Sequence, residues 1–104
     1  MRYKSKRAKA TDIPKAVKEK VFERDNGCCV FCGRPGLPNA HYISRAHGGL
    51  GIEENILTAC PECHRRMDNS AGRKTYLEAA EAYLRRVYQG SWDATRLIYK
   101  KGES

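Results

Sequence analysis

The stretch CVFC at residues 29–32 and the stretch CPECH at residues 60–64 decide how this chain folds. Each contains two cysteines separated by two residues, a spacing that forms a tight turn and directs both sulfur atoms toward one metal ion. Two such pairs supply the four thiolates of a closed tetrahedral zinc site. We therefore expect a structural Zn²⁺ bound by Cys29, Cys32, Cys60 and Cys63. The ion would anchor residues 33–59 as a single loop.

A fifth cysteine, Cys28, could form an alternative Cys-x-x-x-Cys pair with Cys32. Cys29 is the expected ligand because Cys-x-x-Cys followed by Gly33 is the usual metal-binding turn, and the glycine eases that turn. Cys28 is then a small buried or partly exposed thiol. The basic N-terminus has no apolar stretch after it, so we do not expect a signal peptide. Without one, five cysteines indicate metal binding rather than disulfides, and the expected location is the cytoplasm.

The composition indicates one small domain with a polyanionic partner. The chain has 104 residues, of which 40% are hydrophobic and 31% charged, and its formal net charge is +8. Four thiolates around one Zn²⁺ would reduce this charge to about +6. Such a basic balance favours nucleic acid as the partner, although basic charge can also serve solubility alone. No run of eighteen apolar residues occurs, so we expect no membrane span.

Local patterns predict helices on both sides of a short pair of strands, which is an α+β fold. Residues 1–10 contain basic side chains and no acid, and we expect a flexible basic arm there. Residues 11–104 are the predicted single domain. Thr11 or Asp12 can cap a helix that has Pro14 in its first turn. The remaining predicted elements are strands at residues 40–44 and 55–59 and helices at residues 61–69 and 73–89.

Four polar residues in and after the expected zinc-anchored loop suit hydrolysis of phosphodiesters. The reaction needs a base for water and a group that stabilises charge on the leaving oxygen. A histidine such as His41, on the first predicted strand, is a suitable base near neutral pH. Asn55 starts the second strand. His64 and Asp68 are four residues apart and thus share one helical face, where they can offer two ligands to a metal ion with open positions.

Residues 29–69, which contain these motifs, resemble the HNH endonuclease family. The matching segments are Cys29-x-x-Cys32-Gly33, His41-Tyr42-Ile43-Ser44-Arg45, Gly48-Gly49, Asn55-Ile56-Leu57 and Cys60-x-x-Cys63-His64. The resemblance implies a ββα-metal core at about residues 28–70, followed by a C-terminal helix and tail at residues 71–104. The likeness extends to the small HNH proteins of phages and prophages, including those encoded beside packaging genes, which makes phage packaging proteins expected partners.

The resemblance also implies a role for each residue. His41 matches the general base, and His64 matches the metal-binding histidine of the helix. Asn55 matches the asparagine that orients the base or bridges the loop. The four cysteines Cys29, Cys32, Cys60 and Cys63 match the structural zinc ligands that some members carry.

Two positions depart from the family pattern. Ala40 stands where the family usually has an acidic or histidine metal ligand just before the base, and Asp68 stands where many members have a second helix histidine. A carboxylate oxygen is a harder ligand than an imidazole, so Asp68 favours Mg²⁺ or Mn²⁺ over a second zinc. The expected catalytic cofactor is a divalent metal such as Mg²⁺, Mn²⁺ or Ni²⁺.

Structural roles remain open for each of these residues. His41 can be a hydrogen-bonded strand histidine, Asn55 a turn cap and His64 a group near the zinc, while Asp68 can pair with Arg65. The main functional hypothesis is a metal-dependent DNA endonuclease or nickase that contacts the DNA backbone with low sequence specificity. The alternative is a zinc-stabilised DNA-binding module without catalysis. A thiol redox protein is disfavoured, because such proteins use one Cys-x-x-Cys motif rather than two.

Overall fold

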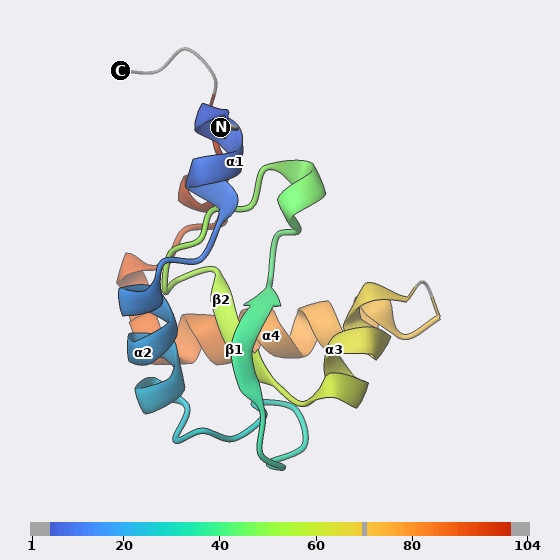
Figure 1. Ribbon diagram of the computed structural model, residues 1–104. Helices are drawn as coiled ribbons and strands as arrows, with labels where there is room; N and C mark the ends of the chain where they lie inside the picture. The colour runs from blue at the N-terminus through green and yellow to red at the C-terminus, as the bar shows by residue number, and fades with distance from the viewer. Residues whose placement is uncertain (1–4, 70, 101–104) are drawn as a thin grey trace, which may run out of the picture.

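Residues 5–69 and 71–100 are described by a computed structural model, shown in Figure 1. A two-stranded antiparallel sheet lies at the centre, with helices on several sides of it (Figure 1). The α-helices and strands are α1 (Lys6–Thr11), α2 (Lys15–Arg24), β1 (Leu37–His41), β2 (Ile56–Ala59), α3 (Pro61–Asp68) and α4 (Arg73–Tyr88). Three short 3₁₀ helices complete the fold: η1 (Arg45–His47), η2 (Gln89–Ser91) and η3 (Ala94–Leu97). The predicted α+β class is confirmed.

The pairing of the two strands determines which side chains of β1 face outward. Ala40 is paired with Leu57 and His41 with Ile56, and the register is irregular between Leu37 and Ala40. Successive side chains of a strand point to opposite faces. Accordingly Asn39 is exposed, Ala40 is fully buried and His41 is half-buried. Asn39 and His41 therefore lie on the outward face of β1, and Ala40 lies in the core.

Apolar side chains from β2, α3, α4 and the C-terminal tail close around the sheet. The largest buried members of this core include Leu57, Met67, Leu84, Trp92 and Leu97. The indole N–H of Trp92 donates to the backbone oxygen of Glu54 at 2.8 Å, which satisfies its polar atom inside the core. This packing fixes α3 and α4 against the strands. Among the described residues, no helix combines the length and the apolar character that crossing a bilayer requires.

A buried ion pair joins α2 to β2 and α4. Arg24 donates to both carboxylate oxygens of Asp25, at 2.7 and 2.9 Å, and also to the backbone oxygen of Ile56 at 2.8 Å. The Asp25 carboxylate further accepts from the Thr58 N–H at 3.0 Å and from the Tyr83 hydroxyl. Burial alone would raise the pKa of Asp25, but these hydrogen bonds more than offset burial and hold that pKa below its ordinary value. The pair therefore stabilises the contact between the helices and the sheet.

The predicted flexible arm is wrong for residues 6–10, which are part of helix α1. Ser5 caps this helix by accepting from the Ala8 N–H at 3.1 Å. Arg7 donates to the backbone oxygen of Ala46 at 2.7 Å, so a tertiary contact holds the helix in place. These interactions outweigh the repulsion among like charges on which the prediction rested. Residues 1–4 of the predicted arm lie outside the described residues.

The largest differences from the predicted boundaries concern the start of α2 and the first strand, while β2, α3 and α4 differ by one residue at one end. Helix α2 begins at Lys15, with Pro14 as an N-cap that makes no side-chain bond. Thr11 instead ends α1, where its hydroxyl donates to backbone oxygens of that helix at 3.0 and 3.2 Å. The first strand spans residues 37–41 rather than 40–44. It ends there because the Asn55 side chain, and not the partner strand, binds the backbone of Ile43.

Candidate active site and zinc site

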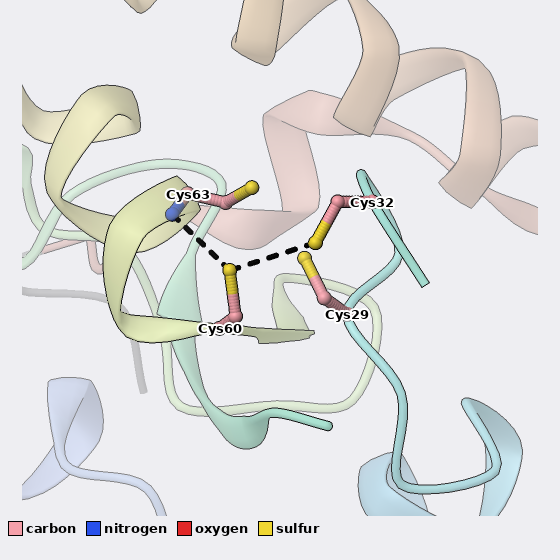
Figure 2. Close-up of side chains that lie close together, drawn as sticks. All are labelled: Cys29, Cys32, Cys60 and Cys63. Carbon is pink, nitrogen blue, oxygen red and sulfur yellow. Dashed lines mark hydrogen bonds between the residues drawn. The ribbon is translucent and has the colours of Figure 1, made fainter. Parts of the chain in front are cut away.

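The four predicted zinc ligands converge. Their sulfur atoms all lie within 4.8 Å of one another, and Figure 2 shows them directed at a common point. The Sγ atoms of Cys32 and Cys60 are 3.6 Å apart. Tetrahedral zinc with Zn–S bonds of about 2.3 Å requires sulfur atoms about 3.8 Å apart, so the donor set fits Zn²⁺. Cys28 is outside this group and its thiol donates to the backbone oxygen of Asn26 at 3.3 Å, in agreement with the choice of Cys29.

Backbone N–H groups donate to two of the four sulfur atoms. The N–H of Cys63 donates to the Sγ of Cys60 at 3.4 Å, and the N–H of Phe31 donates to the Sγ of Cys29 at 3.4 Å. The N–H of Cys63 is the largest of the effects that lower the pKa of Cys60 to about 7, whereas burial raises the pKa of Cys63 to about 12. Cys60 is also the N-cap of α3. Cys63, in the first turn of α3, directly precedes His64. A zinc ion bound by Cys60 and Cys63 would therefore fix the start of α3, and with it His64, to the turn at residues 29–32.

A cavity on the outward side of β1 brings three of the predicted site residues together. It has a volume of about 590 Å³ and we call it the His41 cavity. Its lining residues come from α2, β1, α3 and the segments around them: Asp12, Ile13, Lys18, Asn39, His41, Ser44, Arg45, His64 and Asp68. His41 and the His64/Asp68 pair thus reach one space from the strand and from the helix. Two cations, Lys18 and Arg45, line the same space.

His41 is held by a backbone carbonyl from outside the strands. Its Nε2 lies 2.9 Å from the backbone oxygen of Thr11, at the end of α1. A carbonyl oxygen only accepts, so Nε2 must carry the proton, and the neutral ring then has its lone pair on Nδ1. Burial lowers the pKa of His41, the hydrogen bond to Thr11 opposes this effect, and the nearby charges of Arg45 and His64 add to it. The ring is therefore neutral, and able to accept a proton, near neutral pH.

His64 and Asp68 form an open pair on α3. Nε2 of His64 lies 3.7 Å from Oδ2 of Asp68, and their side chains are 33% and 69% exposed. Both residues also line an adjoining cavity of about 380 Å³, together with Asn39 and Arg65. One imidazole nitrogen and one carboxylate, partly open to solvent, are a donor set that suits a divalent metal with free positions. The alternative pairing of Asp68 with Arg65 is not among the ion pairs found in residues 5–69 and 71–100.

Asn55 lies behind the site rather than in it. It is fully buried and is not among the residues that line the His41 cavity. Its Oδ1 accepts from the N–H of Ile43 at 2.8 Å, and its Nδ2 donates to the backbone oxygens of Ile43 and Leu50 at 3.1 and 2.9 Å. All three bonds close the loop between the strands. Of the two roles that the family resemblance offered, this geometry matches bridging of the loop.

The prediction from sequence missed Asn39. This residue lines both cavities, and its carboxamide can exchange hydrogen bonds with a phosphate or with water there. Alternation along the strand was the available signal, because a residue two positions before His41 shares its face. Ala40, where the family usually has a metal ligand, is 0% exposed and packs in the core.

Comparison with known proteins agrees with this arrangement. Residues 29–70 match the family described as HNH endonuclease. A curated relative, the type IV methyl-directed restriction enzyme EcoKMcrA of Escherichia coli strain K12, is 27% identical over 81 residues. That alignment covers 68% of this chain and 29% of the relative, so the chain spans less than a third of the relative's length. The segment with the zinc ligands, the two strands and α3 is the part that matches the family. This chain therefore contains, at residues 29–70, a segment that matches the HNH endonuclease family.

Proposed function

We propose that this protein is a metal-dependent DNA endonuclease or nickase. The observation that carries the proposal is the His41 cavity, in which a neutral histidine from β1 and a His/Asp pair from α3 share one space within an HNH domain. Hydrolysis of a phosphodiester needs a base for the attacking water and stabilisation of the departing oxygen. These two functions would fall to the strand and to the helix respectively.

Each residue of the cavity has a defined task in this proposal. Nδ1 of His41 accepts a proton from water, because Nε2 already donates to the carbonyl of Thr11. His64 and Asp68 would hold a divalent cation such as Mg²⁺, Mn²⁺ or Ni²⁺. Such a cation supplies Lewis-acid stabilisation of negative charge on phosphate oxygens. The four-cysteine site would hold Zn²⁺ in a structural role, since all its positions are occupied by protein ligands.

DNA is the proposed substrate. The formal net charge of +8 favours a polyanion, and Lys18 and Arg45 bring positive charge to the edge of the cavity itself. The similar protein from E. coli is a restriction enzyme, which supports DNA over RNA. Contacts from lysine and arginine to phosphates hold the backbone and carry little sequence information, so low sequence specificity is expected. A cytoplasmic location, a phage or prophage origin and partnership with phage packaging proteins stay predictions from the sequence.

A DNA-binding module without catalysis is the second candidate, and Ala40 is the observation that favours it. This position offers no metal ligand, and its side chain is buried in the core. The two candidates make different predictions for the same purified protein. A binding module retards DNA on a gel but leaves it intact with every divalent metal.

Cleavage of supercoiled plasmid with Mg²⁺, Mn²⁺, Ni²⁺ or Zn²⁺ tests the proposal. The parent protein should convert plasmid to nicked or linear forms, and His41→Ala should slow this conversion by about 100-fold or more, the usual contribution of a general base. His47→Ala is the matched control. His47 is exposed on η1, where its Nδ1 lies 2.7 Å from the Ser44 hydroxyl, and it does not line the His41 cavity. Equal cleavage by His41→Ala and the parent would exclude this mechanism.

A further inference from the structure

We infer that the N-terminal segment, residues 5–12, is a positioning element of the active site: its last helical residue holds the imidazole of His41 in one orientation and one tautomer. This inference rests on the proposed role of His41 as the base. The segment lies outside residues 29–70, the part that matches the HNH family. The site of this chain therefore includes a part that the matched segment does not contain.

Helix α1 is attached to the end of the molecule where the η1 turn lies (Figure 1). Arg7 donates to the backbone oxygen of Ala46 at 2.7 Å, and Asp12 forms an ion pair with Arg45. The N–H of Gly51 donates to the backbone oxygen of Ala10 at 2.9 Å. The segment is thus bound at three points to the loop that follows His41.

Thr11 is buried, whereas the residues on either side of it are only half-buried. It is 3% exposed, and its hydroxyl donates to the backbone oxygens of Arg7 and Ala8. The last carbonyl groups of a helix have no partner within the helix. The carbonyl of Thr11 is one of these, and it meets Nε2 of His41 at 2.9 Å. A helix end thereby supplies a fixed acceptor that no side chain provides.

This acceptor determines which ring nitrogen is free. With Nε2–H donating to Thr11, Nδ1 alone can accept a proton from water. Without the segment, the ring of His41 would be free to rotate and to exchange between its two neutral tautomers. Only a fraction of the molecules would then have Nδ1 of His41 unprotonated and oriented to accept a proton from water. Misplacement of a reacting group by about 1 Å costs on the order of 100-fold in rate.

Gly51→Ala displaces the segment without changing any charge. A Cβ atom at Gly51 would lie 1.8 Å from the backbone oxygen of Asp12, so Asp12 and the adjoining end of α1 must move. Gly90→Ala is the matched control, because a Cβ atom there meets nothing within 4 Å. The readouts are the ring ¹⁵N signals of His41 in the full chain, the plasmid cleavage rate, DNA affinity and zinc content. With three histidines in the chain, His41→Ala assigns the signals.

The parent and Gly90→Ala should show one neutral tautomer of His41, protonated at Nε2. Gly51→Ala should show averaged or mixed ring signals and cleave roughly 10- to 100-fold more slowly, with DNA affinity and zinc content unchanged. A single tautomer in Gly51→Ala, or mixed tautomers with parental cleavage, would overturn the inference. If no protein cleaves DNA but the tautomer changes as expected, the proposed function fails while the contact is still shown to orient the ring.

A second pair of variants decides the question if Gly51→Ala does not fold. Arg7→Ala and Lys9→Ala each remove one positive charge from an exposed position of α1, but in the described structure it is Arg7 that donates to the backbone oxygen of Ala46. Arg7→Ala should broaden or shift the His41 ring signals and slow cleavage more than Lys9→Ala does. Identical signals and rates in the two variants would overturn the inference.

Discussion

Asn55 binds both polar backbone groups of Ile43: its Oδ1 accepts the N–H at 2.8 Å, and its Nδ2 donates to the carbonyl at 3.1 Å. Asn55→Ala would leave these partly buried groups without this partner, at a cost of about 1–3 kcal/mol for each. We expect the free energy of unfolding to fall by at least about 2 kcal/mol in urea titrations. Asn39→Ala, at an exposed site, should change it by less than about 0.5 kcal/mol.

Comparing Asn55→Ala with the parent protein also separates two roles of Asn55, bridging of the loop and direct participation in the reaction. If it bridges the loop, the cleavage rate of Asn55→Ala should recover when conditions favour the folded state, such as lower temperature or added osmolyte. A variant as stable as the parent that still cleaves slowly would contradict the bridging role and point to direct participation in the reaction.

The zinc site gives a second prediction. Cys60→Ser removes one of the four zinc ligands, while the serine hydroxyl can still cap α3, so the domain should lose zinc and unfold in large part. Cys28→Ser is the matched control, because that thiol is outside the four-sulfur group. Elemental analysis and circular dichroism of both variants provide the measurement. Zinc bound at one ion per chain in Cys60→Ser would contradict the assignment.

The convergence of the four cysteines, the presence of His41 and His64 at one cavity and the order of the core elements could be predicted, because each depends largely on short-range patterns. A Cys-x-x-Cys pair forms its own turn, and the segment from Pro61 to Asp68 forms a helix with proline in its first turn. The choice between Cys28 and Cys29 followed from the same local geometry. These features need no knowledge of contacts between distant residues.

Contacts between distant residues account for what the sequence did not reveal. Helix α1 is held by the hydrogen bond from Arg7 to Ala46, which lies 39 residues away in the sequence. No pattern in the first ten residues predicts that contact. The end of β1 depends on Asn55 replacing the partner strand at Ile43. The carbonyl of Thr11 at His41 is a backbone group, so residue identity does not encode it.

A pH-dependent stability is expected from Asp25. Its pKa is lower in the folded chain than the unfolded value of about 3.9, so its contribution is present above that value and is lost as pH falls through the lower folded pKa. Asp25→Asn should destabilise the protein by about 3 kcal/mol at pH 7, because Arg24 stays largely buried without its partner. It should also reduce the loss of stability between pH 5 and the folded pKa.

Glu19→Gln is the control for this measurement, since Glu19 is exposed on α2. Urea unfolding of the three proteins from acid to neutral pH gives the comparison. A variant Asp25→Asn with the same stability as the parent at pH 7 would show that the Arg24–Asp25 pair does not stabilise the fold.

The His64/Asp68 pair carries the last prediction, which concerns the choice of metal. Removing either side chain should raise the Mn²⁺ or Mg²⁺ concentration for half-maximal cleavage by about 10-fold or more, because even groups that only support a ligand cost about 10- to 100-fold in metal affinity. Stability should barely change, since the pair is partly exposed. Glu62→Gln removes a carboxylate from the same helix, where Glu62 pairs with Arg66 at 2.7 Å, and should leave the metal requirement unchanged.

Asp68→His tests the chemical reason for this preference. The variant keeps two ligands one helical turn apart but replaces a hard carboxylate oxygen by an imidazole nitrogen. In Asp68→His, the cleavage rate with Mg²⁺ should therefore fall, and the ratio of the rate with Ni²⁺ or Zn²⁺ to the rate with Mg²⁺ should rise. Measuring the rate with each metal across a concentration series separates affinity from maximal rate. An unchanged order of metals in Asp68→His would place the catalytic cation away from Asp68, and His64 would then need a different partner.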